Sequence, residues 1–385
     1  MSTEPTRVFH LIKGLGRGGA EMLLAEGLRF ADRDRFHYEY GYFLPHKDAL
    51  VAELCAHGVD VTCFGGVRGA AIVAASHRLA GELRRRHVDV LHCHLPLAGI
   101  AGRLAGRLAG VPVVYTEHNK QERYHPLTRR LNRLTWPMQE RAIAVSGDVA
   151  DSIRRNIGTG VPVDVILNGV DVERFAPNGA GRALRKQLGI DQEALVIGTV
   201  AVFRTQKRLN HWVTAARRIH DRHPDSRFIV VGDGPLRADV MAAVESAGLQ
   251  HVLHAPGLCS DVRPYLDAID IYMMSSIFEG LPVALLEAMS MECVPVCTAV
   301  GGIPEVVVDR RNGLLVQPEE PAALADAVLA VAADPAARAA IGAAARSTVV
   351  ERFSMRRMAG ELETLYTAIA SRHAHLPRPS RAVPA

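Results

Sequence analysis

Two glutamates, Glu279 and Glu287, lie on either side of what the sequence predicts to be the start of a helix. A short apolar strand ends just before them, and Pro282 is typical of a first helical residue, because the N–H that proline lacks has no partner there. The backbone N–H groups of Val283 and Ala284, with the helix dipole, would then attract an anion such as a diphosphate. This segment is therefore a candidate anion site.

The two glutamates suit neutral partners rather than the anion itself. Glu287 comes about one and a half turns into the expected helix, and its carboxylate would accept hydrogen bonds from vicinal hydroxyls such as those of a ribose. Glu279, before the helix, could accept hydrogen bonds from sugar hydroxyls on the other side of the phosphates. The alternative that both are solvated glutamates at a helix edge stays open.

A glycine-rich loop follows the first predicted strand, Val8–Ile12. Gly14, Gly16 and Gly19 satisfy the G-x-G-x-x-G pattern of dinucleotide-binding folds, which indicates an NAD-linked oxidoreductase as one alternative. That pattern requires an acidic residue at the end of the second strand, whereas Glu39 lies in the middle of its predicted strand. A tight turn without a ligand is a further alternative.

His92-Cys-His94 raises the question of a metal. Strand alternation directs His94 toward the mouth of a ligand site at the end of its strand. Two histidines two positions apart need further ligands, which this segment does not offer, so we predict no metal.

Short β-branched runs alternate with helical segments along the chain, which predicts an α/β fold with parallel sheets covered by helices. A Pro-, Asn- and Gly-containing break at 171–181 is the expected linker between a domain of residues 1–172 and one of residues 180–350. A closing helix at about 354–372 is expected to pack back on the first domain, and the tail after it to be disordered. The predicted strands are Val8–Ile12, His37–Phe43, Val59–Phe64, Val88–His92, Val111–Thr116, Ala142–Val145, Val163–Ile166, Leu195–Val202, Arg227–Val231, His251–Ala255, Asp270–Met274, Val294–Cys297 and Gly313–Val316.

Composition excludes several classes. The 385 residues are 48% hydrophobic and 22% charged with a net charge of +4, and the arginines form short scattered runs, so no nucleic-acid partner is expected. Charged residues interrupt every apolar stretch before it reaches the roughly 20 residues of a membrane span, and the N-terminus lacks an apolar signal region. Six cysteines without a Cys-x-x-Cys pair indicate reduced thiols. We therefore expect a cytoplasmic protein.

The Glu279-x7-Glu287 segment, followed by Pro295-Val and Gly301-Gly-Ile-Pro-Glu305, resembles the signature of retaining glycosyltransferases of family four, which have the GT-B fold. Motifs in the same order along residues 7–370 agree with this resemblance. They are Gly18-Gly-Ala-Glu21, Asp89-Val-Leu-His-Cys-His94, Thr116-Glu-His118-Asn, Ile166-Leu-Asn-Gly-Val-Asp171 and Val231-Gly-Asp-Gly-Pro-Leu236.

The resemblance implies two doubly wound Rossmann-like domains facing across a cleft, with the nucleotide diphosphate sugar on the C-terminal domain. It implies an acceptor hydroxyl bound mostly on the N-terminal domain, transfer of a hexose-type sugar with retention, no cofactor and no metal. The residues carried over as catalytic are His118, Glu279, Lys207 and Arg204. Those carried over as donor-binding are Gly18, Gly19, Arg204, Lys207, Gly280, Leu281, Val283, Ala284 and Glu287, and those as acceptor-binding are His94, Glu117 and Asn119.

One position departs from the family. Its usual arginine, five residues before the lysine that neutralises the leaving diphosphate, falls on Val202, whereas Arg204 lies two residues further along. Positions two apart share a face of an extended chain, so Arg204 could supply the missing guanidinium.

Three alternatives remain beside the transferase: the NAD-linked oxidoreductase, a nucleotide-binding protein without catalysis, and a phosphorylase of the same fold. The basic stretch 123–136 carries Leu127, Leu131 and Leu134 along one side. It is expected to be a helix docked on its own domain, with a peripheral contact to an anionic membrane as the alternative.

Overall fold

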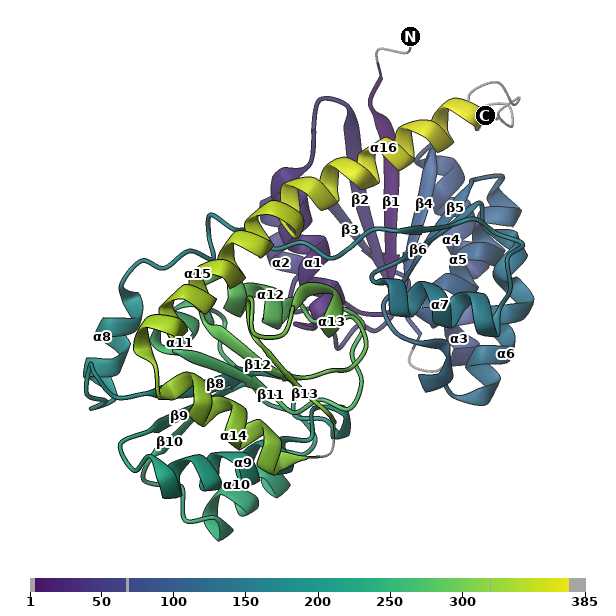
Figure 1. Ribbon diagram of the computed structural model, residues 1–385. Helices are drawn as coiled ribbons and strands as arrows, with labels where there is room; N and C mark the ends of the chain where they lie inside the picture. The colour runs from purple at the N-terminus through teal and green to yellow at the C-terminus, as the bar shows by residue number, and fades with distance from the viewer. Residues whose placement is uncertain (1–3, 67–68, 319, 374–385) are drawn as a thin grey trace, which may run out of the picture. The chain divides into compact units, whose positions relative to one another are not determined.

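The computed structural model describes residues 4–66, 69–318 and 320–373, which form two compact units (Figure 1). Unit 1 combines the chain up to Ala144 with Ala150–Ile166 and the chain from Ala359 onward, and unit 2 combines Val145–Val149 with Leu167–Met358. The division at Ile166 precedes the expected linker at 171–181. That segment packs within unit 2, where the carbonyl of buried Phe175 accepts a hydrogen bond of 2.6 Å from Ser290 Oγ.

The described residues of unit 1 contain one parallel sheet in the order β3-β2-β1-β4-β5-β6-β7. Its strands are β1 (Thr6–Ile12), β2 (Phe36–Tyr42), β3 (Asp60–Cys63), β4 (Val90–His94), β5 (Val113–Glu117), β6 (Arg141–Ala144) and β7 (Val163–Val165). The apolar runs of the central strands are buried on both faces, as parallel sheets require. β4 and β5 extend further than expected, so that His94 and Glu117 are their last residues.

Unit 2 contains a second parallel sheet in the order β10-β9-β8-β11-β12-β13 within the described residues. Its strands are β8 (Val196–Val200), β9 (Arg227–Val231), β10 (Leu253–Gly257), β11 (Ile271–Met274), β12 (Val294–Thr298) and β13 (Leu314–Val316). Trp212 is almost fully buried against this sheet and donates its indole N–H to the carbonyl of Met273 at 2.9 Å. The predicted pair of doubly wound α/β units is therefore confirmed.

Helices connect the strands (Figure 1). Those before the second sheet are α1 (Gly19–Gly27), α2 (Val51–Ala56), α3 (Gly69–Ala74), α4 (Ser76–Arg85), α5 (Pro96–Ala109), α6 (Pro126–Thr135), α7 (Gly147–Asn156) and α8 (Ala180–Gln187). The later ones are α9 (Leu209–Arg222), α10 (Arg237–Ser246), α11 (Arg263–Ala268), α12 (Val283–Ser290), α13 (Ile303–Val306), α14 (Pro321–Ala332), α15 (Pro335–Arg352) and α16 (Met355–His373).

α16 closes the chain, and its part from Ala359 onward belongs to unit 1. Tyr366 donates or accepts a 2.6 Å hydrogen bond with His92 Nδ1, and Glu363 Oε1 accepts one of 3.1 Å from Tyr38. The tail predicted to be disordered lies outside the described residues. Among the described residues no single helix could cross a membrane; only α14 and α15 taken together, bent by 106°, have a suitable length and composition.

α6 departs from expectation in one respect, because two of the three leucines in its stripe are exposed. Leu127 is 60% exposed and Leu134 is 63% exposed, whereas the side of α6 that faces unit 1 presents the buried polar residues Asn132 and Thr135. The prediction that this helix docks on its own domain is confirmed, because α6 packs on α5, but Leu127 and Leu134 do not make that contact. Leu131, the third leucine, is half-buried.

Candidate active site

In each sheet the strand order reverses beside the first strand of the unit, between β1 and β4 and between β8 and β11. Ligands of such sheets bind beyond the carboxyl ends of the strands at this switch point. Lys207 follows β8 and Glu279 follows β11 in unit 2, and His94 ends β4 in unit 1. Lys207, Glu279 and His94 thus lie at the two switch points.

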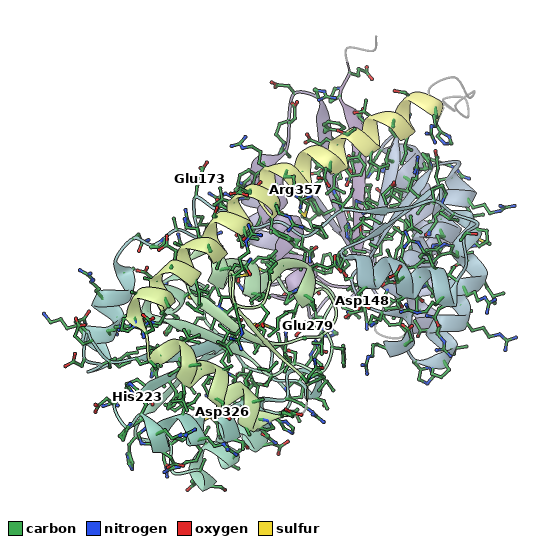
Figure 2. All side chains as sticks on the ribbon, viewed as in Figure 1. Asp148, Glu173, His223, Glu279, Asp326 and Arg357 are labelled. Atoms are coloured by element: carbon green, nitrogen blue, oxygen red, sulfur yellow. The ribbon has the colours of Figure 1, made fainter. Side chains whose placement is uncertain are left out.

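Lys207 and Glu279 form an ion pair at the switch point of unit 2. Lys207 Nζ lies 2.5 Å from Glu279 Oε1, and the two side chains are 15% and 8% exposed. Ser276 Oγ donates a second hydrogen bond, of 2.7 Å, to the same carboxylate oxygen. Figure 2 labels Glu279 among the side chains of unit 2. The second oxygen, Oε2, receives no hydrogen bond from a described residue, so it remains able to accept one from a ligand.

Hydrogen bonds between the two loops hold this pair in place. Ser275 Oγ donates to the carbonyls of Lys207 and Arg208 at 2.8 and 3.0 Å, and Ile277 N donates to the carbonyl of Gln206 at 2.9 Å. The loop after β11 is thereby joined to the turn after β8. Positioning by backbone and short side chains leaves the lysine and glutamate little freedom.

The Gly301-Gly302 turn packs against the backbone of the loop between β11 and α12. Gly301 has a φ of +58°, and a Cβ there would lie 1.9 Å from the carbonyl oxygen of Glu279. Gly302 N donates to the carbonyl of Gly280 at 2.7 Å. Only glycine permits this backbone-to-backbone contact, which explains why the Gly-Gly pair accompanies the glutamate segment.

α12 begins between the two glutamates, as the sequence predicts, although Pro282 is the residue before its first turn rather than in it. Asn168 Nδ2, 113 positions earlier, donates to the carbonyl of Leu281 at 2.7 Å and so fixes the approach to the helix. Glu287 is half-buried on α12, near the phenol of Tyr272. The N–H groups at the start of α12 have no partner within the helix.

Arg204 is placed less favourably than Lys207. It is exposed, as is the side chain of Val202 at 38%, and it lines a hollow of about 290 Å³ together with residues of α9 and α10. Lys207 lines a different and smaller hollow with Ser275 and Ser276. The role of Arg204 beside Lys207 remains a prediction.

Three histidines form a hydrogen-bonded chain at the switch point of unit 1. His10 Nδ1 lies 3.1 Å from His94 Nε2, and His94 Nδ1 lies 3.3 Å from His118 Nε2. Pairing of β1 with β4 places His10 directly opposite His92 and two residues from His94. The rings of His10, His92 and His94 therefore lie on one face of the sheet. His10 is the site residue that the sequence analysis missed, because its only signal is its position on the first strand.

Burial keeps these imidazoles neutral. It lowers the pKa of His10 to about 3 and that of His118 to about 4, and it also lowers the pKa values of His92 and His94. A neutral imidazole carries one N–H. Each hydrogen bond along the chain therefore couples the tautomer of one histidine to that of the next, from His10 to His118.

The fold brings together the three histidines that a metal site would need, because one ring nitrogen each of His10, His92 and His94 lie within 4.8 Å of one another. His10 thus provides the third ligand that the sequence segment lacked. Both nitrogens of two of these rings already have hydrogen-bond partners, however: His92 is held by Tyr366 at 2.6 Å and Thr116 at 2.7 Å, and His94 by two other histidines. The cluster is satisfied as a hydrogen-bonded group.

Glu117 is placed differently from a residue that contacts an acceptor. It is fully buried, and its carboxylate accepts hydrogen bonds from the Tyr115 hydroxyl at 3.1 Å, from the Tyr124 hydroxyl and from the Gln121 amide. Burial raises the pKa of Glu117 to about 7. The residue shapes the turn that carries His118 and half-buried Asn119.

Strained backbone lies next to both switch points. Leu95, directly after β4, has φ +70° and ψ 151°, and Arg208, directly after Lys207, has φ +45° and ψ 47°. The conformation of Leu95 is one that residues other than glycine rarely adopt, at a cost of about 1 to 3 kcal/mol. Such strain concentrates at functional sites.

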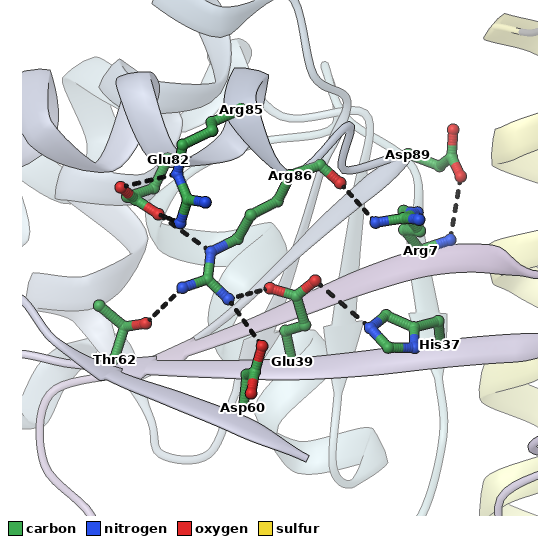
Figure 3. A network of polar contacts seen from close by, with 9 residues as sticks. All are labelled: Arg7, His37, Glu39, Asp60, Thr62, Glu82, Arg85, Arg86 and Asp89. Carbon is green, nitrogen blue, oxygen red and sulfur yellow. Dashed lines mark hydrogen bonds and ion pairs between the residues drawn. The ribbon is translucent and has the colours of Figure 1, made fainter.

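The glycine loop after β1 ends in α1, with Gly18 as the residue before the helix and Gly19 as its first residue. Glu39, the nearest acid on β2, is buried and pairs with Arg86, which also binds Glu82 at 3.0 Å and Thr62 at 2.9 Å (Figure 3). His37 lies 3.4 Å from the other oxygen of Glu39. Because Glu39 is engaged in this network, it cannot hold a ribose, and the dinucleotide alternative loses its acidic residue.

Comparison with known proteins identifies both units. Residues 6–174 match the family described as Glycosyltransferase Family 4, and residues 182–348 match Glycosyl transferases group 1. The alpha-maltose-1-phosphate synthase of Mycolicibacterium smegmatis is 30% identical over 378 residues, which cover 86% of this chain and 96% of that protein. The 2-deoxystreptamine glucosyltransferase of Streptomyces kanamyceticus is 31% identical, covering 78% and 82%.

Solved structures show the same fold. The Anabaena protein HepE in complex with UDP-glucose superposes with a TM-score of 0.85 at 21% identity, covering 94% of this chain and 99% of that one. The sucrose-phosphate synthase of Thermosynechococcus elongatus gives a TM-score of 0.81 at 18% identity, covering 95% and 100%. The fold is GT-B, the resemblance seen in the sequence is confirmed, and the chain belongs to the glycosyltransferases of family four.

Proposed function

We propose that this enzyme transfers a hexose-type sugar from a nucleoside diphosphate sugar to an acceptor hydroxyl, with retention of configuration and without a metal. The observation that carries the proposal is the Lys207–Glu279 ion pair at the switch point of unit 2, beside the start of α12. A cation, a carboxylate with one open oxygen and a helix N-terminus are the groups that a sugar diphosphate requires.

The donor is assigned to unit 2. The first N–H groups of α12, at Val283 and Ala284, would bind the diphosphate, and Glu287 would accept hydrogen bonds from the ribose. Glu279 would hold the sugar hydroxyls through Oε2, since Oε1 is occupied by Lys207 and Ser276. HepE has been solved with UDP and with UDP-glucose, which supports a uridine nucleotide as the first donor to test.

Lys207 would act on the leaving group. The bond between the anomeric carbon and the diphosphate oxygen breaks, the acceptor oxygen bonds to that carbon, and the acceptor proton leaves with the nucleoside diphosphate. Negative charge develops on the diphosphate in this step, and a preorganised ammonium stabilises it. Because an ammonium has three donors, Lys207 can bind the diphosphate while it remains paired with Glu279.

The acceptor is assigned to unit 1, at the end of β4 and β5. His118 and Asn119 follow β5, and the histidine chain holds His118 through His94 at 3.3 Å. The neutral imidazole of His118 can donate or accept one hydrogen bond from a sugar hydroxyl. Glu117 would act by shaping this turn, not by touching the acceptor.

The number of carboxylates supports the part of the proposal that no covalent glycosyl-enzyme intermediate forms. A double displacement uses two carboxyl groups about 5 Å apart around the anomeric carbon. Glu279 is the carboxylate at the switch point of unit 2, and its pairing with Lys207 makes it a poor nucleophile. Lys207 and the start of α12 supply the positive potential that a metal provides in other transferases.

Thermal unfolding with a panel of UDP, GDP, dTDP and NAD tests the donor class. Binding at about 100 times Kd would stabilise the protein by about 2.7 kcal/mol. We expect one nucleoside diphosphate to stabilise the protein, and EDTA not to abolish turnover of the corresponding nucleotide sugar. NMR of the product should show the same anomeric configuration as in the donor. Stabilisation by NAD alone would contradict the proposal, and orthophosphate acting as the preferred acceptor would identify a phosphorylase instead.

A cytoplasmic setting is part of the proposal. All six cysteines, Cys55, Cys63, Cys93, Cys259, Cys293 and Cys297, are free thiols in the structure. Free thiols are characteristic of proteins in reducing compartments.

A further inference from the structure

Buried polar groups hold α6 to unit 1, whereas Leu127 and Leu134 are exposed. Asn132 Oδ1 and Thr135 Oγ1 accept hydrogen bonds of 2.7 and 3.1 Å from the guanidinium of Arg103, and Asn132 Nδ2 donates to Gln121 Oε1 at 3.1 Å. All these residues are buried. The polar side of this helix thus faces the protein.

Arg103 explains this inverted orientation. It is fully buried on α5, its Nε donates to Gln139 Oε1 at 2.6 Å, and its guanidinium lies over the rings of Tyr115 and Trp136 at 4.5 and 5.0 Å. A buried guanidinium is less costly when its N–H groups have acceptors. Nη2 of Arg103 has none among the described residues, so the charge depends on the acceptors of Nε and Nη1. α6 supplies two of them, which fixes the rotation of the helix about its axis.

The same rotation turns leucines and arginines to the surface. Leu127 and Leu134 are seven residues apart, so they lie on one side of the helix, and they are 60% and 63% exposed. Arg130 lies between them at spacings of three and four residues, and Arg129 and Arg133 are exposed beside it. α6 contains no carboxylate, and these three arginines form no ion pair with a residue in the described part of the chain.

We propose that this outer face of α6, formed by Leu127, Leu134, Arg129, Arg130 and Arg133, binds the surface of an anionic lipid bilayer. Leucines on one side and exposed arginines beside them match a membrane interface, where apolar side chains enter the acyl region and guanidinium groups bind lipid phosphates. The charge complementarity favours an anionic membrane over a neutral one. The inference does not depend on the sugar chemistry.

Vesicle co-sedimentation of the full chain tests the proposal. We expect binding to phosphatidylcholine vesicles with about 30 mol % phosphatidylglycerol to be at least tenfold tighter than to phosphatidylcholine alone, and to weaken as salt rises. Each arginine near an anionic surface contributes about fivefold in affinity. The double variant Arg130→Gln/Arg133→Gln should therefore bind about 25-fold more weakly.

The leucines are tested separately. Leu127→Ser/Leu134→Ser should lower the affinity for anionic vesicles at least tenfold, because the apolar contribution is lost. The matched control is Leu258→Ser/Arg218→Gln, which removes a leucine that is 67% exposed and an exposed arginine of unit 2. It should bind like the wild type, and the urea midpoint of each variant should stay unchanged, since none of these side chains is buried.

Three results would overturn the proposal. They are equal binding to neutral and anionic vesicles, vesicle binding that both α6 variants retain, and a wild-type dimer in sedimentation velocity that the leucine variant converts to a monomer. The last result would assign the face to a second copy of the chain.

Discussion

Lys207 Nζ and Glu279 Oε1 lie 2.5 Å apart although 72 positions separate the two residues. The pair is largely enclosed, with the lysine 15% and the glutamate 8% exposed. In such surroundings the removal of one partner leaves the other charge uncompensated, so the two residues must be tested together as well as singly.

Lys207→Ala should lower kcat about 100- to 1,000-fold with a smaller change in KM, because the ammonium acts on charge that develops as the glycosidic bond breaks. Steady-state kinetics with the cognate donor measure this. Lys186→Ala, at an exposed position of α8, is the control and should keep wild-type kinetics. Full activity of Lys207→Ala would remove this role from the mechanism.

The same variant should also be less stable, by about 3 kcal/mol in urea unfolding, because it leaves the Glu279 carboxylate buried without its cation. Lys207→Met/Glu279→Gln should recover much of that loss, since neither charge remains. If the single and double variants unfold at the same urea concentration, the ion pair contributes nothing to the fold.

Arg204→Ala should reduce turnover much less than Lys207→Ala, because Arg204 is exposed and lines a different hollow. If Arg204 reaches the same diphosphate when the donor binds, its effect and that of Lys207→Ala should be non-additive, as for groups in one network. Kinetics of both single variants and the double variant decide between the two cases.

Glu287→Ala should weaken donor binding, because it removes the charged acceptor of two ribose hydrogen bonds, each worth about 1.5 to 3 kcal/mol. Calorimetric titration with the cognate nucleoside diphosphate measures the change. Glu245→Ala, at an exposed position of α10, provides the control. A donor Kd within twofold of wild type in Glu287→Ala would place the nucleotide elsewhere.

The histidine chain predicts a loss of stability in acid. The folded protein holds the pKa of His10 at about 3 and that of His118 at about 4, below the ordinary value of 6.5. Below pH 6.5 the unfolded chain therefore binds protons that the folded protein excludes, and the free energy of unfolding falls as the pH is lowered toward 4.

Each such histidine contributes a slope of about 1.4 kcal/mol per pH unit over that range. Glu117 opposes it, because its pKa of about 7 lies above the ordinary carboxyl value, so its contribution is present at low pH and lost as the pH rises from about 4.5 through 7. Urea unfolding from pH 4 to 7.5 should show a smaller slope for His10→Phe than for the wild type. An unchanged slope would mean that His10 is protonated in the folded protein.

The sequence alone determined the class of fold and the motif that marks the donor side. Strands with β-branched apolar runs, and a helix that begins at proline beside Glu279, are consequences of local backbone and burial preferences, and β1, β9 and α12 appear where these preferences place them. The one-residue shift at Pro282 is within the usual uncertainty of helix ends.

Only the tertiary structure decided which residues meet. His10 joins His94 because β1 pairs with β4, a crossover that no local pattern encodes, and Glu39 is withdrawn from ligand binding by Arg86 from a later helix end. α6 is amphipathic in sequence, yet its polar side hydrogen-bonds to buried Arg103, and Leu127 and Leu134 are therefore exposed to solvent. The hydrophobic periodicity of a sequence predicts that a helix has an apolar and a polar face. Which face packs against the protein depends on the residues that the helix contacts.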